Sequence, residues 1–383
     1  MKFFHLSDLH IGLKLLGRDL MEDQLHILNQ IADAARLEQP DAIVVAGDVY
    51  DKAVPSTEAV AAFDGFIAAL AEAAPRAELM LISGNHDSAQ RLNLFRDVLD
   101  RQRIHMIGLP PTSPEERIEV VTLRDEYGEA DFYLLPFVKP SMVKAIVGVD
   151  ESGNNLSYDE SLRRLWARER VDTSRRNVLV SHQFYVPAGK DAADVERMDS
   201  ETCTVGNIDA VSADLLSPFD YAALGHIHKP MAVGRLNHRY CGTPLACSVS
   251  EAGQQKAIAV VELGPKGDVR VSSIPLTPLR QVKVVAGRLE EALAQGCEDY
   301  VTVVLTDTAA LDAFDLRDRL LAAFPNLLEI RREQRRSPED GPRYEPEAAL
   351  DPLSLCEAFL GEMDDEARAL LKDAVNAALE VRA

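Results

Sequence analysis

The sequence predicts an α/β fold with a largely parallel sheet at its centre. Apolar runs typical of buried strands alternate with segments of helical periodicity, and the runs end in polar residues. The runs 42–46 and 79–82 are apolar throughout, as expected for strands that are covered on both faces. Right-handed crossovers place the carboxyl ends of such strands at one edge of the sheet, where ligands bind. We therefore expect the functional residues at that edge.

The first strand is expected at the apolar run 3–6, which leads to Asp8 and His10. Residues two apart in an extended strand point to the same side, so these two side chains are expected to converge on one object. A crossover helix is predicted over 19–37, where apolar residues recur at helical spacing. The strand that follows it ends at Asp48.

Later parts of the chain repeat this pattern. Helices are predicted over 56–73 and 157–169, and each precedes an apolar run. Five apolar runs in the chain end in residues that can bind a metal ion. In chain order these candidate ligands are Asp8, His10, Asp48, Asn85, His182, His226 and His228. The segment from about 240 to 275 is predicted to form antiparallel strands that close the sheet system.

Seven oxygen and nitrogen ligands exceed the needs of one ion but suit two ions that share a carboxylate, and Asp48 is the candidate bridge. Carboxylate, amide and imidazole ligands without thiolate favour Mn²⁺ or Fe²⁺, and Zn²⁺ less strongly. Two such ions about 3.5 to 4 Å apart activate water and stabilise the entering and leaving oxygens of a phosphate ester. We therefore predict phosphate ester hydrolysis, with His86 as proton donor to the leaving alkoxide and Asp87 orienting or charging His86.

Each of these residues also has a purely structural interpretation. A lone histidine such as His182 is more often a core or surface residue than a ligand, and composition alone explains a turn at 84–87. The coincidence of five strands that all end in ligand-type residues favours the metal site. We expect His5 to be a strand residue or to support a ligand, and Asp51 to cap a loop or support the ligands.

Composition limits the class of protein. With 383 residues, the chain can form one large core and smaller modules. Its 41 basic and 62 acidic residues give a net charge of -21, which argues against non-specific binding of polyanions. Contact with DNA must then come from bound cations or local basic patches. The candidate patches are Arg163, Arg164, Arg168 and Arg170, and Arg331, Arg332, Arg335 and Arg336.

Cysteine usage and hydropathy indicate a cytoplasmic protein. The five cysteines form no CxxC pair, so neither a disulfide framework nor a structural zinc site is expected. We find no leader sequence and no apolar run long enough to cross a bilayer, so no membrane association is expected. Shifts in composition divide the chain into a catalytic domain (1–277), a small α/β capping domain (278–336), a Pro- and Glu-rich linker (337–350) and a C-terminal helical segment (351–383).

The polar motifs together resemble the signature of the calcineurin-like metallophosphoesterases. They are Asp8-x-His10, Gly47-Asp48, Gly84-Asn85-His86-Asp87, His182 and Gly225-His226-x-His228. The resemblance covers about residues 1–275, is strongest to the nuclease branch, and implies a two-sheet sandwich with flanking helices beside the small α+β cap. It also implies that one ion is held by Asp8, His10, Asp48 and His228, the other by Asp48, Asn85, His182 and His226, and that His86 donates the proton. Some members have a histidine where this chain has Asp51, and the role of that histidine is not carried over.

The nuclease branch implies a Mn²⁺-dependent DNase that cuts duplex ends as an exonuclease and hairpins or single strands as an endonuclease. Its members form homodimers, and heterotetramers with a coiled-coil ATPase, in DNA repair, recombination and replication. They dimerise through the helices after Asp48 and Asn85, which could equally be ordinary sheet-covering helices. Independently, the last predicted helix carries an apolar stripe from Leu370 to Leu379, which would be exposed unless it docked on a partner or packed back on the parent domain.

Two other classes of function stay open. The same site could act on a phosphoprotein, a cyclic nucleotide or a small phosphodiester, although this would leave the C-terminal helices unexplained. A non-catalytic scaffold on this fold would be expected to lack ligands, and none is missing.

Overall fold

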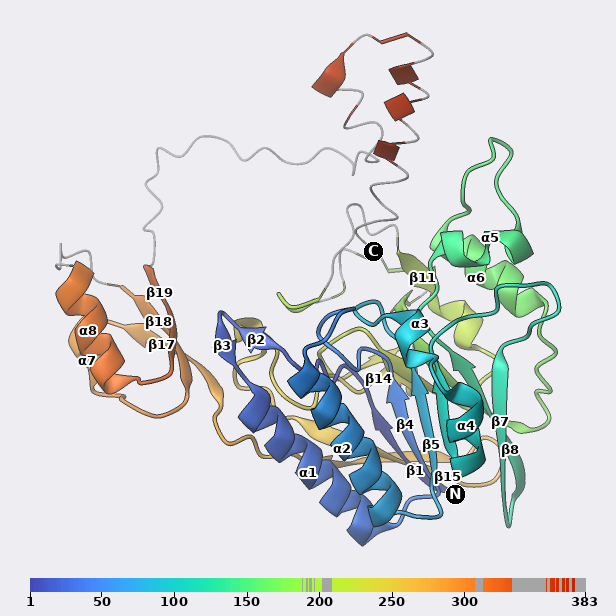
Figure 1. The fold of residues 1–383 in the computed structure, drawn as a ribbon, viewed down its shortest axis with the longest axis horizontal. Coiled ribbons are helices and arrows are strands. Elements are labelled where there is room, and N and C mark those ends of the chain that lie inside the picture. Colours follow the sequence, from blue (N-terminus) through green and yellow to red (C-terminus); the bar gives the residue numbers. More distant parts are fainter. Residues whose placement is uncertain are drawn as a thin grey trace.

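A computed structural model gives the structure of the chain (Figure 1). It describes residues 1–187, 189–190, 192, 195, 197–201, 209–306 and 313–332, and single positions between 356 and 375. The predicted linker 337–350 and most of the predicted C-terminal helices lie outside the described residues. No helix in the described part is both long enough and apolar enough to cross a membrane.

Two six-stranded sheets form the centre of the fold. The first sheet consists, in spatial order, of β16 (Val269–Pro275), β15 (Ala257–Leu263), β1 (Lys2–Leu6), β4 (Ala42–Ala46), β5 (Glu78–Ile82) and β6 (Ile104–Ile107). The second consists of β13 (Met231–Val233), β14 (Arg235–Tyr240), β12 (Tyr221–Gly225), β9 (Arg176–His182), β8 (Gly128–Leu135) and β7 (Glu119–Asp125). β1, β4, β5 and β6 are parallel, and β15 and β16 close the first sheet as antiparallel strands, which confirms the predicted arrangement.

The two sheets pack face to face, and helices cover both outer faces (Figure 1). Between the sheets, the Phe3 ring contacts the rings of Phe132 and Tyr221 edge to face, with centroids 5.3 and 5.6 Å apart. On the first sheet, α1 (Met21–Glu38) and α2 (Thr57–Ala73) bury an apolar layer. On the second sheet, α5 (Pro140–Val147) and α6 (Tyr158–Ala167) do the same. The result is the predicted α/β sandwich in four layers.

Local capping fixes where the predicted helices begin. The Ser56 side chain accepts a hydrogen bond from the Ala59 amide at the start of α2, and Ser157 accepts one from Glu160 at the start of α6. After Asn85, two one-turn helices form, α3 (Ala89–Leu92) and α4 (Arg96–Leu99). They are separated at Phe95, whose φ of 60° cannot continue a right-handed helix.

A small module follows the sandwich and has the predicted β-α-β-α-β order. It contains β17 (Val282–Gly287), α7 (Leu289–Leu293), β18 (Tyr300–Leu305), α8 (Ala313–Ala323) and β19 (Leu327–Arg332), and its three strands are parallel. Arg280 joins the module to α1 through an ion pair of 2.9 Å with Asp23, which also accepts a hydrogen bond of 2.7 Å from the Tyr300 hydroxyl. The exact domain limits stay a prediction.

Candidate metal centre

The seven predicted ligands lie together at one edge of the sandwich. They come from the loops or ends that follow β1, β4 and β5 in the first sheet and β9 and β12 in the second. Six of them are buried and Asn85 is half-buried. The family resemblance divides them into two groups that share Asp48. The groups adjoin each other, since side-chain atoms of Asp8, Asp48 and His182 all lie within 4.8 Å of one another.

The first group consists of Asp8, His10, Asp48 and His228. Nε2 of His10 lies 3.2 Å from Nε2 of His228 and 3.7 Å from Oδ2 of Asp48. Nε2 of His228 lies 3.9 Å from Oδ1 of Asp8. Only one of the two facing nitrogens can carry a proton toward the other, whereas a cation between these atoms would satisfy both.

The second group consists of Asp48, Asn85, His182 and His226. Nε2 of His182 lies 3.3 Å from Oδ2 of Asp48 and 3.0 Å from Oδ1 of Asn85, and Nδ1 of His226 lies 2.9 Å from the same Asn85 oxygen. Burial opposes protonation of His182, but the Asp48 carboxylate outweighs it and raises the pKa of His182 to about 9. A metal ion bound there would therefore displace a proton.

Asp8 and His10 do not lie in an extended strand, as the sequence predicted. β1 ends at Leu6, and the φ angles of Asp8 and His10 are 54° and 44°, in the left-handed region. The Asp8 amide donates to the Gly47 carbonyl at 2.9 Å, and the His10 amide donates to the Asp48 carbonyl at 3.1 Å. The two side chains converge because these hydrogen bonds hold the loop, not because of strand periodicity.

The backbone at the site is tightly packed and strained. A Cβ added to Gly84 would lie 2.1 Å from Oδ1 of Asp48, and one added to Gly225 would lie 1.9 Å from the Ala46 carbonyl oxygen. Asp48 and His226 have φ angles of 50° and 107°. Such backbone conformations are unfavourable for residues other than glycine and are found mainly at functional sites.

The loop of His86 is fixed from two sides. Nδ1 of His86 lies 3.0 Å from the Asp51 carbonyl oxygen, and the His86 amide donates to Oδ1 of Asp48 at 2.9 Å. The Asp87 carboxylate accepts three backbone hydrogen bonds, from Val49, Tyr50 and Gly84, at 3.1, 2.9 and 2.9 Å. Asp87 thus joins the loop after β4 to the loop after β5.

The outer nitrogens of two ligand histidines have acceptors, as is usual for metal-binding imidazoles. Nδ1 of His182 donates to the Ala46 carbonyl at 2.7 Å. Nδ1 of His228 lies 2.7 Å from the Ser200 hydroxyl and 3.5 Å from Oε1 of Glu251. These contacts direct the Nε2 lone pairs inward, so the residues present fit divalent metal ions. Sequence reasoning missed Ser200 and Glu251, because no local pattern marks them.

One buried cation at the site was also missed. The Arg197 guanidinium stacks on the Phe184 ring at 3.7 Å and lies 3.4 Å from both Nε2 of His226 and Oδ2 of Asp209. Its side chain is 9% exposed, and its Nε and Nη1 atoms find no hydrogen-bond partner among the described residues. Buried N–H groups of this kind are rarely left unpaired, so they suit an anionic ligand.

Two arginines of the first candidate cluster for DNA contact, Arg163 and Arg164, lie on α6 and form ion pairs within the protein. Arg163 pairs with Asp159 and Asp214 at 2.6 and 2.8 Å, and Arg164 pairs with Glu160 at 2.6 Å. In the second cluster, Arg335 and Arg336 lie outside the described residues.

Residues 1–230 match the calcineurin-like phosphoesterase family, and residues 275–364 match a family described as the type 5 capsule protein repressor C-terminal domain. The SbcD subunit of the nuclease SbcCD from Staphylococcus saprophyticus is 32% identical to the chain over 300 residues, which cover 78% of this chain and 75% of that protein.

Two solved structures resemble the chain more distantly. GAP50, the anchor in the inner membrane complex of Plasmodium, has a TM-score of 0.42 at 13% identity, with 90% of this chain and 99% of that chain covered. A dimetal phosphatase from Danio rerio has a TM-score of 0.41 at 14% identity, with 73% and 99% covered. These two similarities are too weak to bear on function.

Proposed function

Since the chain belongs to the calcineurin-like phosphoesterase family and is a metal-dependent phosphodiesterase of its SbcD nuclease branch, we propose that it cuts DNA with two divalent ions as the nuclease component of a complex with an SbcC-type ATPase. The observation that carries this proposal is the convergence of seven ligands in two groups that share Asp48. Carboxylate, amide and imidazole ligands suit Mn²⁺ or Fe²⁺, and the resemblance to the nuclease branch favours Mn²⁺.

The proposed ligand sets follow the two groups of side chains. Asp8, His10, Asp48 and His228 hold one ion, and Asp48, Asn85, His182 and His226 hold the other. When bound, two such ions supply an activated water and neutralise the charge that develops on the phosphate. The protein's own contribution is to fix the ligands on strained loops and to exclude competing water.

His86 donates the proton to the leaving oxygen. Its Nδ1–H donates to the Asp51 carbonyl at 3.0 Å, which fixes the ring. To act as the donor, the ring must carry a second proton on Nε2, which passes to the leaving oxygen and is regained from solvent. Asp87 supports this role by holding the loop through its backbone hydrogen bonds. Arg197, whose Nε and Nη1 find no partner among the described residues, contacts a phosphate oxygen and places a positive charge beside the metal centre.

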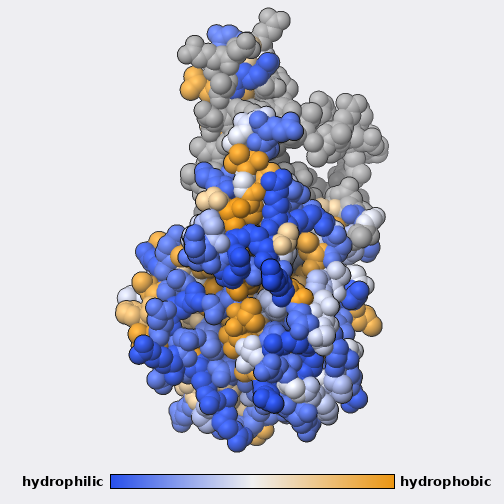
Figure 2. All heavy atoms as spheres, turned by 90° about the vertical axis from the view of Figure 1, so that its right-hand side faces the viewer, coloured by the Kyte–Doolittle hydropathy of each residue, from blue (hydrophilic) through white to orange (hydrophobic). Residues whose placement is uncertain are grey.

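The proposed assembly is a homodimer that joins the ATPase as a heterotetramer. In the turn before α4 and on α4 itself, the side chains of Leu94, Phe95 and Val98 are 58, 74 and 62% exposed, which supports a protein interface there. Figure 2 views the molecule from the side of α4 and β7 and shows hydrophobic patches on this otherwise hydrophilic face. Near the C-terminus, Phe359 and Leu370 are 90 and 66% exposed, which supports docking of this segment on the ATPase. The complex would act in cytoplasmic DNA repair, recombination and replication.

The test is cleavage of linear duplex and hairpin DNA by the purified full-length chain in Mn²⁺, with and without the ATPase. We expect nucleotides or short oligonucleotides to be released from duplex ends, and hairpins to be opened. Absence of any DNA product under all conditions, together with turnover of small chromogenic phosphodiesters, would instead assign the site to a small substrate.

A further inference from the structure

We infer that Glu251, with Lys256 as its countercharge, is a positioning residue for His228 and so determines the affinity of the ion group to which His228 belongs. This inference rests on the proposed function, because it concerns the same metal centre. It assigns a role to two residues outside the seven ligands.

The His228 ring lies between the metal centre and Glu251. Its Nε2 faces the centre, 3.2 Å from Nε2 of His10. Its Nδ1 faces away, 2.7 Å from the Ser200 hydroxyl, which in turn donates to Oε1 of Glu251 at 3.0 Å. An acceptor at this position holds the proton on Nδ1 and keeps the lone pair on Nε2, where a ligand needs it.

Glu251 is a buried carboxylate that accepts several hydrogen bonds. Its side chain is 0% exposed, and Oε2 accepts from the Lys256 ammonium at 2.6 Å and from the Thr243 hydroxyl at 2.8 Å. Oε1 accepts from the Cys247 amide at 3.1 Å as well as from Ser200. A buried carboxylate persists only when its charge and lone pairs are satisfied in this way.

His182 and His228, one from each group, differ in how their Nδ1 atoms are held. Nδ1 of His182 donates to a backbone carbonyl, that of Ala46 in β4, whose position the sheet fixes. His228 instead depends on side chains, one of them from the short 3₁₀ helix Val249–Glu251. A substitution of one side chain can therefore weaken the His228 group and leave the His182 group intact.

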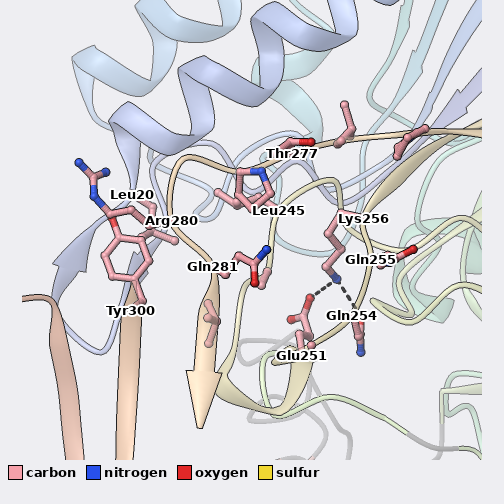
Figure 3. A pocket seen from close by; sticks show the side chains of 16 residues that line it. Leu20, Leu245, Glu251, Gln254, Gln255, Lys256, Thr277, Arg280, Gln281 and Tyr300 are labelled. Atoms are coloured by element: carbon pink, nitrogen blue, oxygen red, sulfur yellow. Dashed lines mark hydrogen bonds and ion pairs between the residues drawn. The ribbon is translucent and has the colours of Figure 1, made fainter. Parts of the chain in front are cut away.

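The pair also reaches the junction between the sandwich and the small module. Figure 3 shows Lys256 between Glu251 and Gln254 in the wall of a cavity of about 350 Å³, which Arg280 and Tyr300 line from the other side. Lys256 donates to Oε1 of Gln254 at 2.9 Å. Glu251 and Lys256 thus connect His228 at the metal centre with the junction between the two domains.

The test compares three variants of the full-length protein by calorimetric Mn²⁺ titration and thermal unfolding. In Glu251→Gln, Lys256 and Thr243 hold the amide oxygen, so the amide NH₂ replaces Oε1 and no longer accepts from Ser200 or the Cys247 amide. Ser200 can then donate to Nδ1 of His228, which favours the proton on Nε2. We expect one of two Mn²⁺ binding events to weaken about 10- to 100-fold. Lys256→Met is the matched control, because it disrupts the same network but leaves a carboxylate facing His228.

We expect Lys256→Met to lower the melting temperature and to keep both binding events within about threefold of the wild type. In the double variant Glu251→Gln/Lys256→Met, the amide can turn its oxygen to His228, and part of the lost Mn²⁺ affinity should return. The inference would be overturned if Glu251→Gln showed both Mn²⁺ binding events with wild-type affinity, or if it lost both events. It would also be overturned if Lys256→Met weakened Mn²⁺ binding as much as Glu251→Gln does. A wild-type chain that binds fewer than two ions would overturn the proposed function itself.

Discussion

The Nε2 atoms of His10 and His228 lie 3.2 Å apart, although 218 positions separate the two residues in the chain. His10 follows a strand of the first sheet and His228 follows a strand of the second. The first ligand group therefore exists only when both sheets are packed together. Metal binding should for this reason stabilise the sandwich as a whole, by an amount that grows with the free metal concentration.

The proton donor can be separated from the ligands. His86→Gln removes the imidazole that donates the proton, so DNA cleavage should fall at least about 100-fold while metal content stays at the wild-type value. The amount of DNA product measures cleavage, and elemental analysis measures metal content. His105→Gln is the control, because His105 is not among the predicted ligands. Its ring nitrogens lie 2.9 Å from Glu78 and 2.6 Å from Asp100. A loss of metal in His86→Gln would show that His86 is a ligand.

The close packing at Gly84 gives a prediction about a single methyl group. In Gly84→Ala, the new Cβ would lie 2.1 Å from Oδ1 of Asp48, so the loop or the shared carboxylate must move and metal binding should be lost. Gly65→Ala in α2 is the control, since its Cβ would meet nothing within 4 Å, and it should be neutral or stabilise by about 0.5–1 kcal/mol. Wild-type metal content in Gly84→Ala would refute the bridging role of Asp48.

The role of Arg197 is tested with a small phosphodiester and an inhibitor. Arg197→Met should lower kcat/KM about 10-fold or more and weaken inhibition by inorganic phosphate, because a charged donor to the phosphate is lost. Arg163→Met removes the same charge from a residue that pairs with Asp159 and Asp214, and should leave both quantities unchanged. Equal phosphate inhibition in wild type and Arg197→Met would exclude the contact.

His5 should make stability depend on pH. Burial lowers the pKa of His5 to about 3, and the ring lies 2.9 Å from the Tyr221 hydroxyl. Between the unfolded value near 6.5 and the folded value near 3, only the unfolded chain binds the proton, so stability falls as pH falls through this window. The free energy of unfolding of the metal-free protein, measured with denaturant between pH 6 and 4, should fall with falling pH. This fall should be about 1.4 kcal/mol per pH unit steeper than in His5→Gln. Identical slopes would show that His5 is not buried in its neutral form.

The sequence predicts the strands, and the polar residues that follow them, well because both depend on local patterns. A run such as 42–46 is apolar over its whole length, and Asp48 follows it directly. The predicted helices over 19–37 and 56–73 appear as α1 and α2 within about two residues at each end. Periodicity and capping are properties of neighbouring residues, which a single sequence displays.

What the sequence could not predict depends on contacts between distant segments. Nothing near Glu251 indicates that it reaches His228, and a lone Arg197 resembles any surface arginine. The cluster around Arg163 looked more suitable for DNA, but Arg163 and Arg164 pair with nearby acids. The left-handed backbone at Asp8 was likewise hidden, because hydrogen bonds to the loop after β4 impose it.

The central claim is that one chain holds two ions through a shared Asp48 carboxylate. Elemental analysis of the purified protein after equilibration with Mn²⁺ and removal of free metal tests it most directly. We predict two Mn²⁺ per chain in the wild type and loss of both in Asp48→Asn, because each group uses this side chain. A single ion per chain, or two ions retained in Asp48→Asn, would contradict the account.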